Sequence, residues 1–149
     1  MRFTAIAALL LAAVASAQSP PFSNCAPGAT DMTVTSFSLS PDPPCVDQTY
    51  CSNVTGTLNT PIIDGAKLAI TGRYGGRVIY TDNHDLCTLL AASGHPCPVS
   101  VTTTSLSLCV LLKPNSPLNY PMALTIQANN GNGNVLFCQV ATVVPRACS

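Results

Sequence analysis

The chain has 149 residues, with six basic side chains, six acidic side chains and a formal net charge of zero at pH 7. This balance argues against a basic surface of the kind that binds nucleic acid or anionic membranes. Glutamate and tryptophan are absent, whereas threonine, valine, serine and proline are plentiful. The composition therefore favours β-strands over helices.

The first 17 residues have the pattern of a secretory signal peptide. Arg2 supplies a positive charge, residues 5–14 form a short apolar run, and Ala15-Ser16-Ala17 has the small-x-small form of a cleavage site. The apolar run is too short to cross a bilayer. We expect residues 1–17 to be a signal peptide and residues 18–149 to form one domain, secreted or held in the lumen of the vacuole or secretory pathway.

Strand-like segments recur along the rest of the chain, with turn residues between them. In chain order they are Met32–Ser40, Tyr50–Leu58, Lys67–Tyr74, Arg77–Thr81, Val101–Leu112, Met122–Ala128 and Val135–Val144. One or two helical turns are expected at Asp85–Ala92, and the Asn-Gly steps of residues 129–134 suit a hairpin turn. These elements predict an all-β fold, an antiparallel β-sandwich.

Alternation of apolar and polar residues assigns a buried face to three of these strands. The apolar positions are Phe37 and Leu39 in the first strand, Leu68 and Ile70 in the third, and Leu106, Leu108, Val110 and Leu112 in the fifth. The segment Arg77–Thr81 has no face that is cleanly apolar. Its buried side chains are therefore left unassigned.

Eight cysteines follow the signal segment, at positions 25, 45, 51, 87, 97, 109, 138 and 148. An even number of cysteines in a small exported chain indicates a disulfide framework formed in an oxidising compartment. Spacing alone leaves roughly a hundred connectivities open. Short separations favour Cys45 with Cys51 and Cys87 with Cys97.

An ordered set of short motifs gives the clearest indication of a family. The motifs are Phe22-Ser23-Asn24-Cys25, Leu39-Ser40-Pro41, Pro43-Pro44-Cys45 leading to Cys51, Cys87 followed by Cys97-Pro98, Asn119-Tyr120-Pro121 and Val135-Leu136-Phe137-Cys138. Their order and spacing resemble the ML lipid-recognition domain family, which includes the Niemann-Pick type C sterol carrier and the fungal phosphatidylglycerol/phosphatidylinositol transfer proteins. The resemblance covers essentially the whole chain after residue 17.

The resemblance implies an immunoglobulin-like sandwich whose two sheets are splayed around an apolar cavity that holds a lipid. It implies a secreted monomer that carries a sterol or a phospholipid, contacts donor and acceptor membranes transiently, and needs no cofactor, metal or catalytic chemistry. It also implies disulfides Cys25–Cys138, Cys45–Cys51 and Cys87–Cys97. Cys109 and Cys148 are left to pair with each other.

The resemblance also suggests which residues contact the lipid. It places Tyr120, Pro121 and the segment Val78, Ile79 and Tyr80 at the entrance, and Leu39 deeper in the cavity. Alternation adds a set of wall candidates, each of which also suits an ordinary core. These are Phe37, Leu68, Ile70, Leu108, Val110, Leu124, Ile126 and Phe137.

Two other interpretations remain open. A solid core of valine, leucine and isoleucine would make the chain a secreted recognition or wall-associated module without lipid. Alternatively, Asp82, His84 and Asp85 could belong to a hydrolase or metal site, but the chain has no Gly-x-Ser-x-Gly motif and no glutamate. We interpret these three residues as a polar loop before Cys87, and we expect no enzyme activity.

Two polar residues are expected at the surface. Asn53-Val54-Thr55 is a glycosylation sequon, and we expect Asn53 to carry a glycan. Lys113 is expected to affect neither folding nor binding, which would make its replacement a neutral control.

Overall fold

The computed structural model describes residues 20–149, so the predicted signal peptide lies outside the described residues. The elements, in chain order, are β1 (Ser23–Asn24), β2 (Met32–Ser40), β3 (Thr49–Leu58), β4 (Lys67–Tyr74), β5 (Arg77–Asp85), α1 (Leu86–Ala92), β6 (Ser105–Leu111), β7 (Met122–Asn129) and β8 (Val135–Val143). Within the described range, no helix has the length and apolar character that crossing a bilayer requires.

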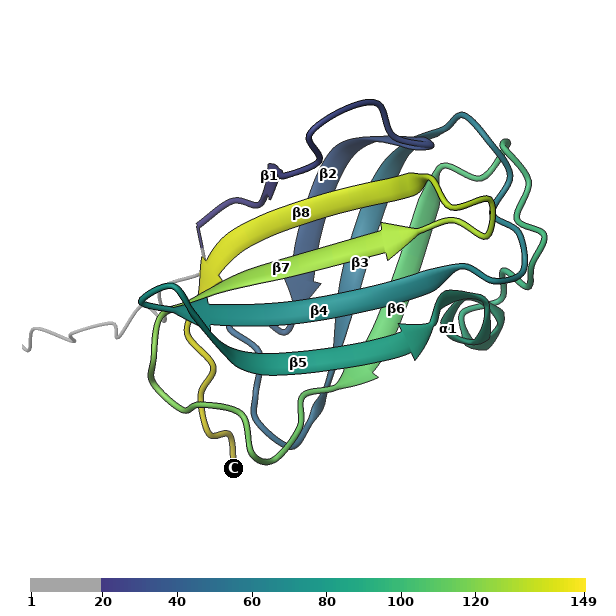
Figure 1. The fold of residues 1–149 in the computed structure, drawn as a ribbon. Coiled ribbons are helices and arrows are strands. Elements are labelled where there is room, and N and C mark those ends of the chain that lie inside the picture. Colours follow the sequence, from purple (N-terminus) through teal and green to yellow (C-terminus); the bar gives the residue numbers. More distant parts are fainter. Residues whose placement is uncertain (1–19) are drawn as a thin grey trace, which may run out of the picture.

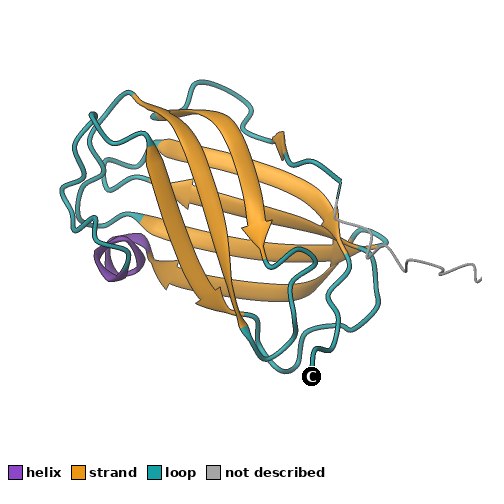
Figure 2. Cartoon of the chain, turned by 180° about the vertical axis from the view of Figure 1, so that it is seen from behind, coloured by secondary structure: helices purple, strands orange, loops and turns teal. Residues whose placement is uncertain are grey.

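The strands form two antiparallel sheets packed face to face (Figure 1). The larger sheet has the order β1-β8-β7-β4-β5, and the smaller sheet has the order β2-β3-β6. Strands of the smaller sheet run steeply across those of the larger one, as views from both sides show (Figure 2). The predicted all-β antiparallel sandwich is thus confirmed.

The space between the sheets has two open sides, because edge strands of different sheets do not pair. We call them the β1–β2 edge and the β5–β6 edge, after the edge strands that bound them. At one end of the β5–β6 edge lies α1, which contacts β5 and β6 and buries Leu86 and Leu90 in the core. The side chain of Asp85 caps this helix by accepting a hydrogen bond from the Thr88 N–H.

Two strands differ by more than one residue from the sequence-based expectation. The fifth predicted segment, Val101–Leu112, becomes strand only from Ser105, because residues 101–102 form a turn. Conversely, β5 continues past Thr81 to Asp85, so the predicted polar loop before Cys87 is wrong. Asp82 is buried on the same face of β5 as Tyr80. Because a charged residue occupies this buried position, the segment lacks the alternation of apolar and polar residues that would identify its buried face.

The predicted hairpin turn at residues 129–134 joins β7 to β8, and its asparagines have a further role. The amides of Asn130, Asn132 and Asn134 all donate to the carboxylate of Asp31, at 2.9, 3.1 and 3.3 Å. Asp31 directly precedes β2, so these bonds connect the smaller sheet to the larger one. We call this set of four residues the Asp31 clamp.

Four disulfides hold the described residues together, and no cysteine is free. They join Cys25 to Cys138, Cys45 to Cys148, Cys51 to Cys109, and Cys87 to Cys97. The first and last are the pairs that the resemblance implies. The other two correct it.

The expected Cys45–Cys51 and Cys109–Cys148 pairs are wrong because strand register outweighs closeness in sequence. Cys51 lies inside β3, directly opposite Cys109 of β6, with the two Cα atoms 4.0 Å apart. The backbone of Cys45 instead pairs with that of Arg146 in an isolated β-bridge, and Arg146 lies two residues before Cys148. That bridge brings the C-terminal tail to Cys45.

Candidate functional site

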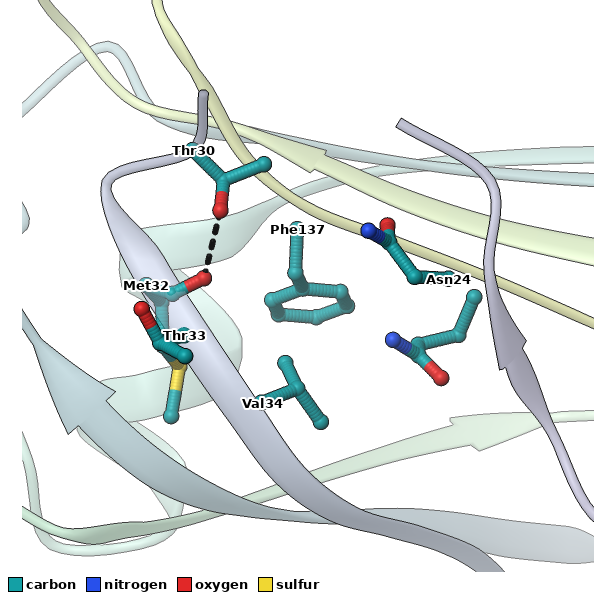
Figure 3. A pocket seen from close by; sticks show the side chains of 7 residues that line it. Asn24, Thr30, Met32, Thr33, Val34 and Phe137 are labelled. Atoms are coloured by element: carbon teal, nitrogen blue, oxygen red, sulfur yellow. Dashed lines mark hydrogen bonds between the residues drawn. The ribbon is translucent and has the colours of Figure 1, made fainter. Parts of the chain in front are cut away.

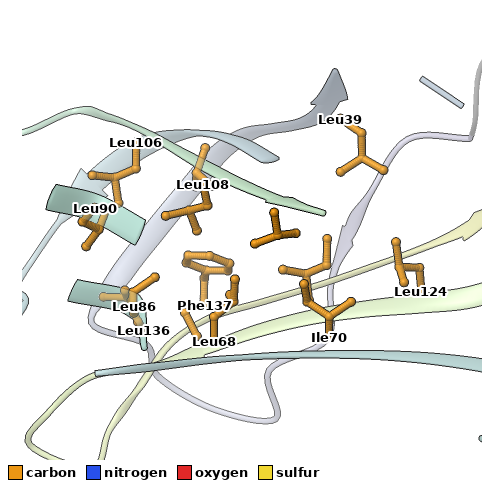
Figure 4. Close-up of a cluster of buried hydrophobic side chains, with 14 of the residues drawn as sticks. Leu39, Leu68, Ile70, Leu86, Leu90, Leu106, Leu108, Leu124, Leu136 and Phe137 are labelled. Carbon is orange, nitrogen blue, oxygen red and sulfur yellow. The ribbon is translucent and has the colours of Figure 1, made fainter. Parts of the chain in front are cut away.

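The inner faces of the two sheets are lined almost entirely by apolar side chains. Most of the predicted wall residues lie in this buried cluster: Leu39, Leu68, Ile70, Leu108, Val110, Leu124, Ile126 and Phe137 (Figure 4). Phe37 is half-buried and packs against the cluster. Side chains from β2, β4, β6, β7 and β8 thus meet between the sheets.

The residues expected at the entrance fall into two groups. Val78 and Tyr120 are exposed by 52% and 54%, and the ring of Tyr120 contacts that of Tyr74 edge to face at 5.6 Å. Pro121 is exposed as well. Tyr80, by contrast, is a buried member of the core, and Ile79 is half-buried beside it. The segment therefore runs from solvent at Val78 to the interior at Tyr80.

A pocket of about 120 Å³ opens at the β1–β2 edge (Figure 3). Phe137 forms its centre, between Met32 and Val34 of β2 and Asn24 of β1. Typical small-molecule sites have volumes of about 300–1,000 Å³, so this pocket is too small to enclose a lipid. In the described conformation, side chains occupy most of the space that the resemblance assigns to a cavity.

A larger pocket of about 290 Å³ lies at the β5–β6 edge. It is lined by Val78, Ile79, Tyr80, Thr81, Lys113 and Asn115. Three of these residues were expected at the entrance, and the pocket places them beside the loop that follows β6. The segment Val78 to Tyr80 is therefore next to an opening.

Lys113 crosses this edge, from the residues after β6 to β5. Its ammonium group donates to the Thr81 carbonyl at 2.8 Å and lies 3.2 Å from a carboxylate oxygen of Asp82. Its backbone N–H donates to the Tyr80 hydroxyl at 3.4 Å, and Nζ lies 5.8 Å from the centre of the Tyr80 ring. We call these contacts the Lys113 clasp. They link one sheet to the other, so Lys113 is not the neutral position that was expected.

The Asp82 carboxylate has a second partner, because His84 Nε2 lies 2.7 Å from its other oxygen. The Asp82 side chain is only 8% exposed, so burying its negative charge requires such partners. A cation and an imidazole satisfy the carboxylate without any nucleophilic hydroxyl in the set. Asp82, His84 and Lys113 thus form a polar contact at the β5–β6 edge, with the Asp82 carboxylate buried.

Tyr50 is an interior residue that the sequence-based prediction of the site missed. It lies at the start of β3, opposite Val110 in the register with β6, and is 1% exposed. Its hydroxyl has no hydrogen-bond partner among the described residues. Burial, reinforced by the negative charges possible at Tyr80 and Asp82, raises the pKa of Tyr50, so its hydroxyl is protonated and neutral at physiological pH.

The alternation of β3 could have revealed Tyr50. Buried positions recur at every second residue from Tyr50 to Leu58, but two of them are Ser52 and Gly56. These small residues hide the apolar face from a search for large side chains. A Cβ atom on Gly56 would collide with the Thr33 carbonyl, so the close approach of β2 requires glycine there.

Asp64 lies close to Cys87 and Cys97 in an arrangement that resembles a set of metal ligands. Both sulfur atoms belong to the Cys87–Cys97 disulfide. Because metals bind thiolates, these two cysteines are unavailable as ligands while the bridge is intact.

Comparison with known proteins agrees with this architecture. The ML domain family pattern matches residues 19–144. A phosphatidylglycerol/phosphatidylinositol transfer protein of Aspergillus oryzae is 31% identical over 102 residues, which make up 67% of this chain and 57% of that protein. The chain therefore matches little more than half the length of this relative.

Two solved structures share the fold. A Niemann-Pick type C2 protein from the Japanese carpenter ant matches with a TM-score of 0.66 and 12% identity, over 84% of this chain and 98% of that one. Chicken MD-1 complexed with lipid IVa matches with a TM-score of 0.50 and 12% identity, over 81% and 85%. The pattern match spans most of the sequence, and both structures have the same kind of sandwich. This chain belongs to the ML domain family.

Proposed function

We propose that this protein binds an apolar lipid between its two sheets and transfers it between membranes. The observation that carries the proposal is the pair of apolar inner faces, which belong to separate sheets whose edge strands do not pair with each other. Separating the sheets would expose these faces to a ligand without breaking any strand pairing. Burial of the lipid's apolar surface drives binding, at about 25 cal/mol per Å².

The disulfides are compatible with such a separation. Cys25–Cys138 and Cys51–Cys109 each connect neighbouring strands of one sheet, and Cys87–Cys97 closes a local loop at α1. Only Cys45–Cys148 joins the segments that lead into β3 and out of β8. The bridges therefore stiffen each sheet and tether the two at one corner, leaving the rest of the contact between them noncovalent.

The relatives support the class of ligand. A family member transfers phosphatidylglycerol and phosphatidylinositol according to its name, and MD-1 holds lipid IVa in its solved complex. We propose a sterol or a phospholipid as the cargo, carried by a monomer that contacts donor and acceptor membranes transiently. Four disulfides suit an oxidising compartment. Residues 1–17 would direct the chain into the secretory pathway.

The proposal is tested with protein secreted from a eukaryotic host. Lipid should be extractable from the purified protein, and delipidated protein should take up a fluorescent sterol or phospholipid. Ile126→Phe, which fills the space between the sheets, should reduce uptake at least tenfold. Ala123→Phe adds the same ring on the exposed face of β7 and should bind normally.

The closed interior favours a second candidate, a recognition module that carries no lipid. The described side chains already fill the space between the sheets, as they do in an ordinary sandwich. Protein that yields no lipid on extraction and takes up neither probe would establish this alternative. Uptake that Ile126→Phe blocks and Ala123→Phe does not would exclude it.

A further inference from the structure

The geometry points to Tyr50 as the residue that selects hydroxyl-bearing lipids. Its hydroxyl forms a hydrogen bond with a ligand's hydroxyl group just inside the β5–β6 edge. The inference rests on the proposed lipid binding and deepens it. It assigns a specific partner to a polar atom that has none in the described structure. The predicted ligand is an uncharged lipid with one hydroxyl at the end of an apolar body.

The position of Tyr50 suits this role. It lies on the inner face of β3, opposite Val110, in the apolar space between the sheets. Val110 belongs to β6, the strand that bounds this edge, and lies three residues before Lys113, whose backbone N–H donates to the Tyr80 hydroxyl of β5. Tyr80 in turn lines the pocket at the β5–β6 edge. A ligand that enters there passes Tyr80 before it reaches Tyr50.

The neighbouring polar groups are already occupied. Asp82 is paired with Lys113 and His84, and the Tyr80 hydroxyl accepts a hydrogen bond from the Lys113 backbone. Tyr50 therefore stands out as a buried donor and acceptor that is still available. Because its hydroxyl is neutral, it suits an alcohol better than a phosphate or carboxylate, whose charge would be buried without compensation.

The unpaired hydroxyl also gives a reason for selectivity. Burying a hydroxyl without a hydrogen bond is unfavourable, and a ligand hydroxyl at this place satisfies both groups at once. A ligand of the same shape without a hydroxyl leaves Tyr50 unpaired. A site built in this way discriminates against the analogue that lacks the polar group.

The test is a competition between cholesterol and 5-cholestene, which have the same ring system but differ in the hydroxyl. Delipidated protein is incubated with an equimolar mixture, reisolated, and extracted so that the bound ligands can be quantified by mass spectrometry. We expect the wild-type protein to favour cholesterol by about tenfold, the effect of one buried hydrogen bond. In Tyr50→Phe the preference should disappear, while binding of 5-cholestene is retained.

Two further measurements separate this role from a structural one. Tyr50→Phe keeps the ring and removes only the unpaired hydroxyl, so the melting temperature of the lipid-free protein should not fall. Tyr74→Phe removes a hydroxyl from a ring that is 48% exposed and should retain the preference for cholesterol. A variant that loses both ligands equally would overturn the inference, because it indicates damage to the core.

The remaining outcomes distinguish failure of the inference from failure of the proposed function. Equal binding of cholesterol and 5-cholestene by the wild type would overturn the role of Tyr50 and leave lipid binding intact. Uptake of a fluorescent phospholipid without any sterol would do the same. If the protein takes up no sterol, no 5-cholestene and no phospholipid, the proposed function itself is wrong and the inference falls with it.

Discussion

Replacing Lys113 with methionine should open the β5–β6 edge more often. The substitution removes the bond to the Thr81 carbonyl and the ion pair with Asp82 but retains the apolar length of the side chain. A charged hydrogen bond contributes about 1.5–3 kcal/mol. Lys113 is 43% exposed and His84 still faces Asp82, so we expect a loss of only about 1 kcal/mol.

A loss of about 1 kcal/mol corresponds to about a fivefold larger population of the open edge. We therefore expect lipid exchange between fluorescent donor vesicles and the protein to be about fivefold faster in Lys113→Met, with a correspondingly lower free energy of unfolding in urea. Lys67→Met removes an exposed lysine at the start of β4, where it pairs in register with Asp85, and should change neither quantity. Unchanged exchange despite reduced stability would refute the idea that the Lys113 clasp closes the entrance.

Three further predictions concern the framework. Non-reducing peptide mapping should recover Cys45 linked to Cys148, and the double serine variant of this pair should lose about 2–4 kcal/mol of stability, because the bridge spans 103 residues. Asn130→Ala should lower the free energy of unfolding by about 2 kcal/mol, measured in urea, because it leaves Asp31 with fewer donors in a buried site. Asn53 should carry a glycan in a glycosylating host, detectable by a mass shift on enzymatic deglycosylation. Asn53 lies in the middle of β3, where its Oδ1 accepts a hydrogen bond from Ser107. An unmodified peptide would show that this position prevents modification.

The parts of the fold that sequence predicts well are those in which side-chain type follows burial. In β6, Leu106, Leu108 and Val110 alternate with exposed or half-buried neighbours, so the sequence predicts which residues form the inner face. The turn between β7 and β8 is also predictable, because asparagine and glycine tolerate its backbone. The contacts that the same asparagines make with Asp31 are not, since about a hundred residues separate them in the chain.

The candidate site is harder to predict because its polar residues face inward. Asp82 interrupts the inner face of β5, and its partner Lys113 comes from the loop that follows β6, so neither residue carries a local signal. Tyr50 has the pattern of a core residue, but the missing partner of its hydroxyl becomes visible only in three dimensions. The two corrected disulfides have the same cause, because Cys51 and Cys109 become neighbours only through strand pairing.

The two edges of the sandwich are held in different ways, and the difference indicates where a ligand enters. At the β1–β2 edge, the Asp31 clamp makes three hydrogen bonds, and the Phe37 ring lies between those of Phe22 and Phe137 at centroid distances of 4.7 and 5.9 Å. At the β5–β6 edge, α1 covers one end. The rest of this edge has the partly exposed Lys113 clasp and a pocket of 290 Å³ next to it. Buried contacts resist separation more than a solvent-screened lysine does. We therefore expect the sheets to hinge at the β1–β2 edge and to open at the β5–β6 edge, which leads a lipid past Tyr80 to Tyr50.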